Sequence, residues 1–412
     1  MLSEKVRQRG LIALLIDVFC MYTGFFMVIP LISIHYVDGL GWAAATIGLI
    51  LGVRQIAQQG LTLFGGMLAD QVGAKGLICA GLFVRITGFV LLAWANTLPL
   101  LFVASILAAL GGALFESPRA AAIAALTRPE ERQHFYSLAG AISGIGMAIG
   151  PLLGAALLHV DFAVVALVGA TCFAINLIQT FIMLPPIRVS TGTGGMGQGI
   201  KLVLRDQQFL IYTALIIGFW FIWVQLNMSL PLIAQHLTGT SDSVGVIYAV
   251  NSIMMIGLQY PLLRFLTKHI QPLILLTLGL TIISIGIGSV ALASGMMTLI
   301  ASIIIFSLGG LLIQPTHQTV TASLANQAAL GSYFGVSSLA LAIGGGLGNY
   351  SGGLLYGLGE AINMPALPWL VFCAVGLISA VGLGLMHLHQ LRTNQQTENR
   401  QPESSVVAHS HQ

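Results

Sequence analysis

Charged residues are scarce in this sequence. Only 7% of its 412 residues are Asp, Glu, Lys or Arg, while 56% are hydrophobic. A typical soluble chain contains about 25% charged residues. This shortage excludes an ordinary soluble domain and indicates a polytopic membrane protein. The net charge of +3 gives no indication of a nucleic acid partner, and we expect none.

The sequence also lacks the motifs of common enzymes and metal sites. Its four cysteines lie inside apolar runs, with neither metal-ligand spacing nor a disulfide framework. Its many glycines include no loop that ends in the Lys–Ser/Thr pair of a P-loop. No Ser/His/Asp or Cys/His set can be placed on helix faces that would meet. We therefore predict no enzymatic activity, no cofactor and no bound metal.

Long apolar runs are abundant instead. A helix of about 20 apolar residues is long enough to cross a bilayer. The runs are too long for barrel strands, and backbone polar groups in lipid must be satisfied within their own segment, so helices are expected. The predicted fold class is an all-α integral membrane protein with twelve spans, at residues 11–36, 44–69, 77–95, 98–126, 137–158, 162–184, 208–235, 243–263, 272–293, 297–325, 332–356 and 367–390.

The basic residues predict the orientation, because cytoplasmic loops carry an excess of Lys and Arg. Thirteen of the 16 lie at the N-terminus, in alternate loops or in the C-terminal tail, and the loops in between carry none. Both termini are therefore predicted to be cytoplasmic. The other three lie inside predicted helices: Arg54, Arg85 and Arg119.

A stretch rich in Gly, Ser and Thr divides the chain. Residues 185–207 read PPIRVSTGTGGMGQGIKLVLRDQ and combine the composition of a flexible linker with a basic amphipathic end. This linker separates residues 1–184 from residues 208–391, and each of these halves holds six predicted spans. Residues 392–412 are predicted to form a polar cytoplasmic tail that is disordered from about Thr393.

The two halves are related in sequence. Residues 109–126, ALGGALFESPRAAAIAAL, align without a gap to residues 307–324, SLGGLLIQPTHQTVTASL. Across this offset of 198 positions, Glu116 becomes Gln314 and Arg119 becomes His317. Two six-helix halves related as parallel repeats, with a site between them near the bilayer midplane, are a known transporter architecture. Two stripes of small residues, which suit close helix packing, share the offset: Gly146, Gly150 and Gly154, and Gly344, Gly348 and Gly352.

Two motifs resemble those of a known family. The stretch GGMLADQVGAKG resembles the cytoplasmic signature of the major facilitator superfamily, G-x-x-x-D-R-x-G-R-R/K, although Gln71 and Ala74 depart from its basic positions. The run GMAIGPLLG resembles the antiporter signature of that superfamily's twelve-span drug:proton exporters. The matching residues are Gly66, Asp70, Gly73 and Lys75 in the first motif, and Gly146, Gly150, Pro151 and Gly154 in the second.

The resemblance implies a transporter of the bacterial inner membrane that is driven by the proton gradient. Its expected partners are protons, a small-molecule substrate and the lipid bilayer, and we expect a monomer. The resemblance also implies that Asp70 helps to lock the cytoplasmic gate against the start of the helix near Ser332, where the helix dipole is positive. An ordinary loop acid is the alternative for Asp70.

Three ionisable residues lie close to one depth inside the predicted helices. Arg119 and Asp17 are both roughly 10 Å from the cytoplasmic face, and Glu116 is one turn deeper. A charged side chain at the bilayer centre costs about 2.5–3.5 kcal/mol on insertion scales, so such residues usually have a function. In the resembled fold the helices that carry Asp17 and Arg119 adjoin, so the resemblance implies that these two residues can pair, with Glu116 left free or sharing the arginine. We predict that Asp17 or Glu116 takes up the coupling proton. A purely structural ion cluster is the alternative.

Two further arginines lie at other places in the N-terminal half. Arg54 is roughly 12 Å from the outer face and shares a helix face with Gln58. It either contacts an anionic substrate or pairs with an acid across a cavity. Arg85 is expected to form a structural pair or to extend toward the cytoplasm, since its helix is peripheral in the resembled fold.

The C-terminal half is polar rather than charged, and it is predicted to supply a neutral wall of the substrate cavity. Aromatic and amide side chains suit amphipathic molecules, because they combine apolar contact with a few orienting hydrogen bonds. Interfacial anchoring and interhelical hydrogen bonds are the alternatives. The candidate lining residues, counting those of the N-terminal half, are Tyr22, Phe25, Arg54, Gln58, Trp223, Asn227, Asn251, Gln314 and His317.

Three functions are compatible with these features. The first is proton-coupled export of small amphipathic molecules by alternating access. The second keeps the fold and changes the cargo to a specific metabolite, such as an exported siderophore or an imported sugar or peptide. The third is a membrane sensor that transports nothing. The embedded acids and the repeat favour the first.

Overall fold

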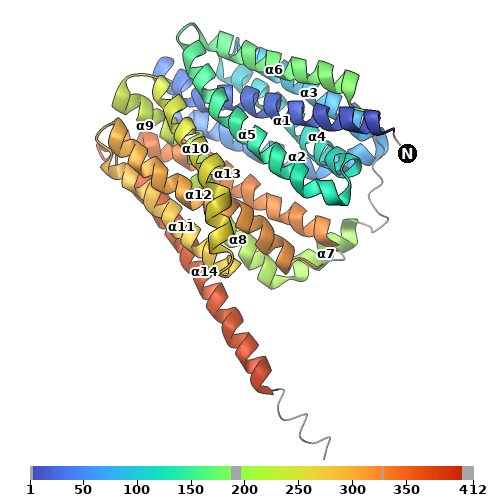
Figure 1. The fold of residues 1–412 in the computed structure, drawn as a ribbon. Coiled ribbons are helices and arrows are strands. Elements are labelled where there is room, and N and C mark those ends of the chain that lie inside the picture. The colour runs from blue at the N-terminus through green and yellow to red at the C-terminus, as the bar shows by residue number, and fades with distance from the viewer. Residues whose placement is uncertain (1–2, 187–195, 327–328, 401–412) are drawn as a thin grey trace, which may run out of the picture.

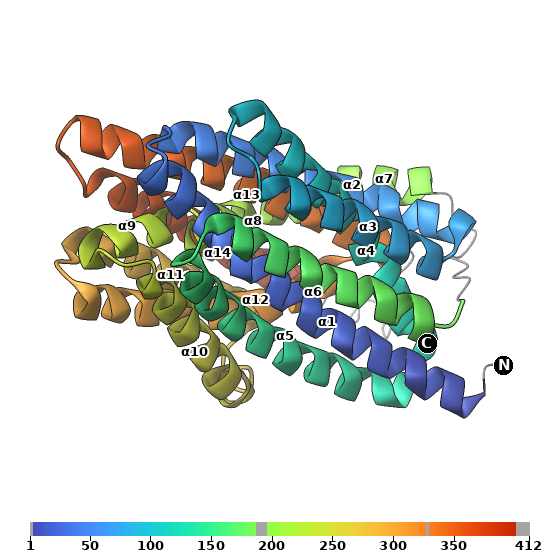
Figure 2. The ribbon, with the colours of Figure 1, turned by 90° about the horizontal axis from the view of Figure 1, so that it is seen from above.

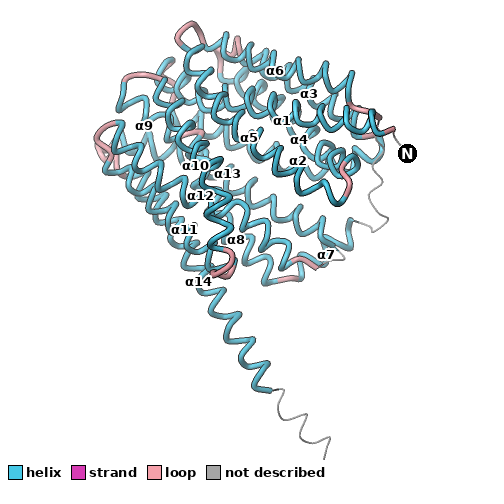
Figure 3. The backbone as a smooth tube through the Cα atoms, viewed as in Figure 1, coloured by secondary structure: helices cyan, strands magenta, loops and turns pink. Residues whose placement is uncertain are grey.

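The computed structural model of the chain describes residues 3–186, 196–326 and 329–400. Within these ranges some side chains, among them those of residues 63–72, are not described. Every regular element of the described part is a helix, as Figure 3 shows.

The first six helices form the N-terminal half of the molecule. The chain begins with α1 (Glu4–Ser33), which passes into one π-helical segment, η1 (Ile34–Gly39). The remaining helices of this half are α2 (Ala44–Val72), α3 (Ala74–Leu92), α4 (Leu98–Leu126), α5 (Pro129–Leu158) and α6 (Phe162–Met183).

A short helix, α7 (Met196–Arg205), leads into the C-terminal half. The helices of this half are α8 (Gln207–Trp223), η2 (Val224–Leu226), α9 (Ser229–Thr238), α10 (Asp242–Leu266), α11 (Pro272–Ser289), η3 (Val290–Leu292), α12 (Met296–Leu324), α13 (Leu330–Ala361) and α14 (Leu367–Arg400). Figure 1 shows the two halves side by side, with α7 at the same end as the N-terminus.

The predicted spans match these helices. Within the described residues, ten helical stretches are long and apolar enough to cross a membrane. The other two predicted spans correspond to α2 and α13, which have 29 and 32 residues. The span predicted at 208–235 is not one continuous helix, because the turn η2 interrupts it between α8 and α9. Helix α14 continues to Arg400, beyond the point from which the tail was expected to be disordered.

The sequence repeat is also a repeat of contacts. In the N-terminal half Gly111 of α4 packs against Gly81 and Arg85 of α3. In the C-terminal half Gly309 of α12 packs against Gly279 and Ile283 of α11. Each residue of the second set lies 198 positions after its counterpart, so the two halves use equivalent positions to bring equivalent helices together.

The halves meet toward one end of the bundle, the end opposite to the N-terminus and α7. There the start of α2 packs on the end of α13, where Gly48 faces Asn349, and the end of α5 packs on the start of α10, where Leu152 faces Gly245. His159 Nε2 also lies 3.0 Å from Asp242 Oδ1 across the two halves. Toward the end that holds the N-terminus the ribbons of the two halves diverge (Figure 1). Figure 2 shows α5 and α10 close together at the opposite end. We call these the closed end and the terminal end.

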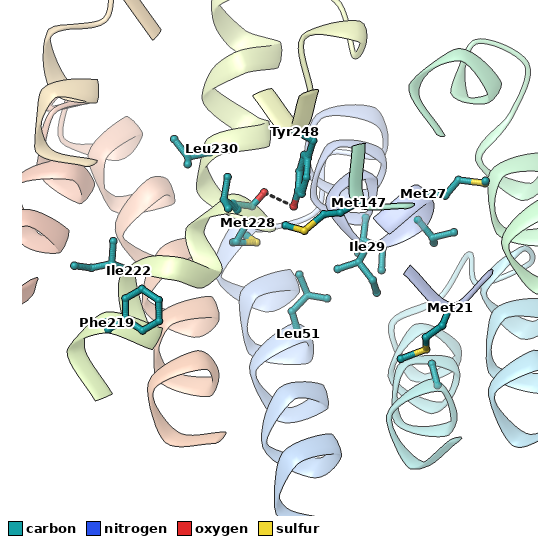
Figure 4. Close-up of a cluster of buried hydrophobic side chains, with 14 of the residues drawn as sticks. Met21, Met27, Ile29, Leu51, Met147, Phe219, Ile222, Met228, Leu230 and Tyr248 are labelled. Atoms are coloured by element: carbon teal, nitrogen blue, oxygen red, sulfur yellow. Dashed lines mark hydrogen bonds between the residues drawn. The ribbon is translucent and has the colours of Figure 1, made fainter. Parts of the chain in front are cut away.

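Apolar side chains from both halves form the contact near the closed end. Figure 4 shows Met147 of α5 pointing toward Met228 and Tyr248 of the C-terminal half. Tyr248 is fully buried, and its hydroxyl, which has one hydrogen to donate, lies 2.9 Å from Leu226 O and 2.6 Å from Asn227 Oδ1. Its ring lies 5.7 Å from that of Phe26 on α1. This dense contact closes the bundle on the side away from the termini.

Candidate proton and substrate site

Asp17 and Arg119 form an ion pair between α1 and α4. Arg119 Nε lies 3.9 Å from Asp17 Oδ2. The side chain of Asp17 is 2% exposed and that of Arg119 is 17% exposed. Neither carboxylate oxygen of Asp17 has a hydrogen-bond partner among the described residues. The predicted pair is therefore present. The attraction between the two charges holds it together, without a hydrogen bond.

Glu116 has a different partner. It is half-buried one turn before Arg119, and Gln58 Nε2 donates a 3.4 Å hydrogen bond to Glu116 Oε1. The other end of the same amide faces Arg54, because Arg54 Nη1 donates to Gln58 Oε1 at 3.0 Å. Gln58 thus connects a carboxylate of α4 to a guanidinium of α2. The shared helix face of Arg54 and Gln58 predicted this second contact, and nothing in the sequence predicted the first.

Arg54 is enclosed on the remaining sides. Its Nη2 donates to Gln55 Oε1 at 3.1 Å, its guanidinium carbon lies 5.3 Å from the centre of the Phe25 ring, and the residue is 3% exposed. Its Nε has no hydrogen-bond partner in the described part of the chain. One alternative predicted an acid as the partner of Arg54. The structure shows two amides and one aromatic ring around it instead.

Of the two alternatives predicted for Arg85, the structure contradicts the extension toward the cytoplasm. Arg85 does not extend to a membrane surface, because only 1% of it is exposed. Its guanidinium lies over three rings, 5.1 Å from that of Phe25, 6.0 Å from that of Phe89 and 4.9 Å from that of Phe173. Its Nε and Nη1 have no hydrogen-bond partner among the described residues. Arg85 therefore belongs to the same interior cluster as Arg54, Gln58 and Glu116.

The glycine pair of α4 makes room for this cluster. A methyl group on Gly112 would lie 2.8 Å from Arg85 Nη1 and 3.0 Å from Gln58 Nε2. The counterpart of Gly112 in the C-terminal half is Gly310, and the side chain against Gly310 is the indole of Trp223. Trp223 stacks on Phe306 with ring centres 5.7 Å apart. Equivalent glycines thus accommodate charged and polar groups in one half and an aromatic ring in the other.

His317, the counterpart of Arg119, takes part in a network of neutral groups. Its Nδ1 lies 2.7 Å from the hydroxyl of Tyr212, and its Nε2 lies 3.2 Å from that of Ser337. Tyr212 also lies within hydrogen-bond distance of His317 O, at 3.1 Å. The network joins α8, α12 and α13 and satisfies both ring nitrogens, so its contacts are those of a helix-packing histidine.

The other predicted lining residues have varied surroundings. Asn251 is fully buried, and its Oδ1 accepts a 3.0 Å hydrogen bond from Ser307, which joins α10 to α12. Asn227 accepts from Tyr248, and Gln314 is half-buried on α12. Tyr22 is half-buried on α1 and stacks on Phe26 at 6.0 Å. Phe26 and Tyr248 were not among the predicted residues, although the contact between their rings joins the two halves.

The glycine stripe of the antiporter-like motif belongs to α5 and packs against α1. A methyl group on Gly146 would lie 3.0 Å from Tyr22 Cβ, and one on Gly150 would lie 2.7 Å from Thr23 O. Gly154 contacts Met27 in the same way, while Pro151 is buried within α5. The stripe fixes α5 against the helix that carries Asp17.

The gate motif is only partly described. The surroundings of Gly66 and the side chain of Asp70 lie outside the described part, so the predicted contact of Asp70 with the start of α13 stays a prediction. Gly73 joins α2 to α3 with φ +88°, a conformation that favours glycine. Lys75 lies 5.4 Å from the ring of Phe181 on α6. Ser332 at the start of α13 faces Gly199 of α7.

Comparison with known proteins decides the family. The model of the Major Facilitator Superfamily matches residues 14–349. The chain belongs to the Major Facilitator Superfamily. It is accordingly a multi-pass membrane transporter and not an enzyme.

Relatives within this superfamily include proteins named multidrug resistance protein MdtH. The chain is 40% identical to one from Yersinia enterocolitica over 382 residues, which cover 93% of this chain and 95% of the relative. The same identity and coverage hold for one from Yersinia pestis. Among solved structures, a POT family transporter bound to a thioalcohol-conjugated peptide has a TM-score of 0.79 at 14% identity, covering 92% of this chain and 96% of the other. A likeness at that identity concerns the fold.

Proposed function

We propose that this transporter exports small amphipathic molecules in exchange for protons. The MdtH relatives, named for multidrug resistance, support the direction and the class of cargo. The proton gradient supplies the energy, and the protein acts in the inner membrane of a bacterium as a monomer with both termini in the cytoplasm. In that orientation the terminal end faces the cytoplasm, and the conformation described here is closed to the outside.

The observation that carries the coupling proposal is the different pairing of the two interior acids. The charge of Asp17 is compensated by Arg119 at 3.9 Å. Glu116 is bonded to the neutral amide of Gln58 and is half-buried, one turn from an arginine that is itself partly exposed. A coupling acid must exchange protons with water, so Glu116 is the better placed of the two. Arg119 pairs with Asp17 and lies one helical turn after Glu116 on α4, so it can exchange its partner when Asp17 is protonated.

Proton release from everted membrane vesicles tests this function. Vesicles that contain a pH-sensitive dye are exposed in turn to cationic drugs, neutral drugs and siderophores. We expect the amphipathic drugs to dissipate the proton gradient in the wild type, Glu116→Gln to abolish this release, and Asp17→Asn to reduce it. Glu360→Gln is the matched control, because Glu360 is an exposed carboxylate of α13 near the closed end.

Two results would overturn the proposal. Full drug-driven release in both single variants and in the double variant would remove the coupling role of the two acids. Release by siderophores alone would replace the drug-like cargo by a specific metabolite.

A further inference from the structure

The interior of the N-terminal half contains more cationic than anionic side chains. Three arginines, Arg54, Arg85 and Arg119, lie there with two acids, Asp17 and Glu116. Of these three arginines, only Arg119 lies within 4.0 Å of a described acid. Arg54 and Arg85 are 3% and 1% exposed, so they carry two almost fully buried charges without an ion-pair partner. Buried charges are normally paired, because an isolated one is costly to bury.

The two unpaired guanidinium groups converge on one place. Both have their carbon atoms within 5.3 Å of the Phe25 ring centre. The amide of Gln58 accepts from Arg54, and Gln58 Nε2 and Arg85 Nη1 both lie within 3.0 Å of the position that a methyl group on Gly112 would take. The amide of Gln58 therefore lies close to both guanidinium groups. Three N–H donors around it have no hydrogen-bond partner among the described residues: Arg54 Nε, Arg85 Nε and Arg85 Nη1.

The equivalent place in the C-terminal half is filled by apolar groups. There Gly310 receives the indole of Trp223, and the counterpart of Arg85 is Ile283, which packs on Gly309. The fold thus needs no charge at this position for its packing. The charged version in the N-terminal half calls for a different explanation, and unsatisfied donors point to a ligand that accepts hydrogen bonds.

We propose that Arg54 and Arg85 bind one anionic group, which takes the place of the Gln58 amide between them. A carboxylate fits this role, because the guanidinium fork matches the two oxygens of a carboxylate. One negative charge also brings the formal sum of the five interior side chains to zero. The anionic group belongs either to the transported molecule or to a free inorganic anion such as chloride. The first case rests on the proposed function and narrows its cargo to amphipathic molecules that carry a carboxylate.

The competing explanation is that aromatic rings alone stabilise Arg85. Its three ring contacts are favourable for a cation. In that case replacement of Arg85 changes the stability of the protein and leaves ligand affinity unchanged. Binding measurements on the purified full chain separate these two explanations, and they do not depend on transport.

The probes are 1-naphthylacetate and its methyl ester, which differ in the negative charge. Calorimetric titration of the purified protein in a dilute buffer without chloride or carboxylate ions gives the affinity for each. We expect the acid to bind roughly tenfold or more tightly than the ester, as one or two charge-assisted hydrogen bonds imply. Arg54→Gln and Arg85→Gln should remove this preference. Arg264→Gln, which removes an exposed cation at the end of α10, should retain it.

Chloride distinguishes the two sources of the anion. If chloride weakens binding of 1-naphthylacetate in the wild type and not in Arg54→Gln, the site also accepts a free anion. Should Arg85→Gln fail to fold, Arg54→Gln and Arg85→Lys carry the test, since the lysine variant keeps the charge and loses the fork. Equal affinity for acid and ester, or a preference that survives in both arginine variants, overturns the anion site. If only the anion site is wrong, a cationic drug should still drive proton release from vesicles. If the proposed function is wrong as well, this release should also be absent.

Discussion

Arg119 Nε approaches Asp17 Oδ2 to 3.9 Å, and neither carboxylate oxygen accepts a hydrogen bond from the described residues. The contact joins α1 to α4 within the interior of the N-terminal half. An ion pair without hydrogen bonds has little geometric restraint, so its partners can separate at low cost. Such a loose pair suits a residue that must change partners during a transport cycle.

Removal of one member of this pair should destabilise the protein. Asp17→Asn leaves the Arg119 charge uncompensated in a mostly buried position, and we expect a loss of about 2 kcal/mol in the free energy of unfolding. Thermal unfolding in detergent measures the change. The double variant Asp17→Asn/Arg119→Gln should recover most of the loss, because no unpaired charge remains. An additive effect of the two substitutions would show that the pair contributes no coupling energy.

The close contact of α5 with α1 can be tested with two glycines of the same helix. A methyl group on Gly150 would lie 2.7 Å from Thr23 O and 3.0 Å from Met27 N, both backbone atoms. Gly150→Ala should therefore cost about 1–3 kcal/mol. Gly140→Ala is the control, because a methyl group there meets no atom of the described residues within 4 Å. The control should be neutral or stabilise by up to about 1 kcal/mol. Equal unfolding temperatures for both variants would contradict the packing role of the stripe.

The His317 network should matter for stability and not for coupling. Tyr212→Phe removes the hydroxyl that faces His317 Nδ1 and leaves a buried polar atom without its partner. We expect a loss of about 1–2 kcal/mol in the free energy of unfolding. Tyr260→Phe, at a position that is 71% exposed, should change little. If Tyr212→Phe instead altered drug-driven proton release at unchanged stability, the histidine would belong to the coupling machinery.

An ion cluster at the terminal end predicts a dependence of stability on pH. Arg7 on α1 contacts Glu4 and Glu131, both at 2.6 Å, outside the apolar part of the helices. Its hydrogen bonds hold the pKa of each carboxyl below the ordinary value of 4.5. The stabilisation is therefore complete above that value and is lost as the pH falls through the lowered pKa.

Thermal unfolding between pH 7 and pH 3 measures this effect. Unfolding temperature should fall more steeply on acidification in the wild type than in Arg7→Gln, because the variant has already lost the contacts. The effect is expected to be small, since exposed ion pairs contribute little. Parallel curves for the two proteins would show that the cluster makes no contribution. Lys201→Gln on α7 is a control that removes an exposed cation elsewhere at this end.

Some features of the candidate site could be predicted from the sequence because they depend on local spacing. Arg54 and Gln58 are four residues apart on one helix, so their contact follows from helical geometry. The pairing of Asp17 with Arg119 followed from their similar depth, together with the adjacency of their helices in the resembled fold. The contact of Gln58 with Glu116 and the position of Arg85 did not follow, since both depend on how α2, α3 and α4 are rotated about their axes.

By itself the sequence determined the helical spans, the repeat with its offset of 198 positions and the concentration of interior charge in the N-terminal half. These features can be read from apolar runs and residue types along the chain. Each spanning segment must by itself be long and apolar enough to cross the bilayer and must satisfy its own backbone hydrogen bonds. The tertiary structure decided which side chains meet. A helix that is apolar on every side shows no contrast between its lipid face and its core face. Only packing, through glycines such as Gly111 and Gly112, turned Arg85 inward beside Gln58.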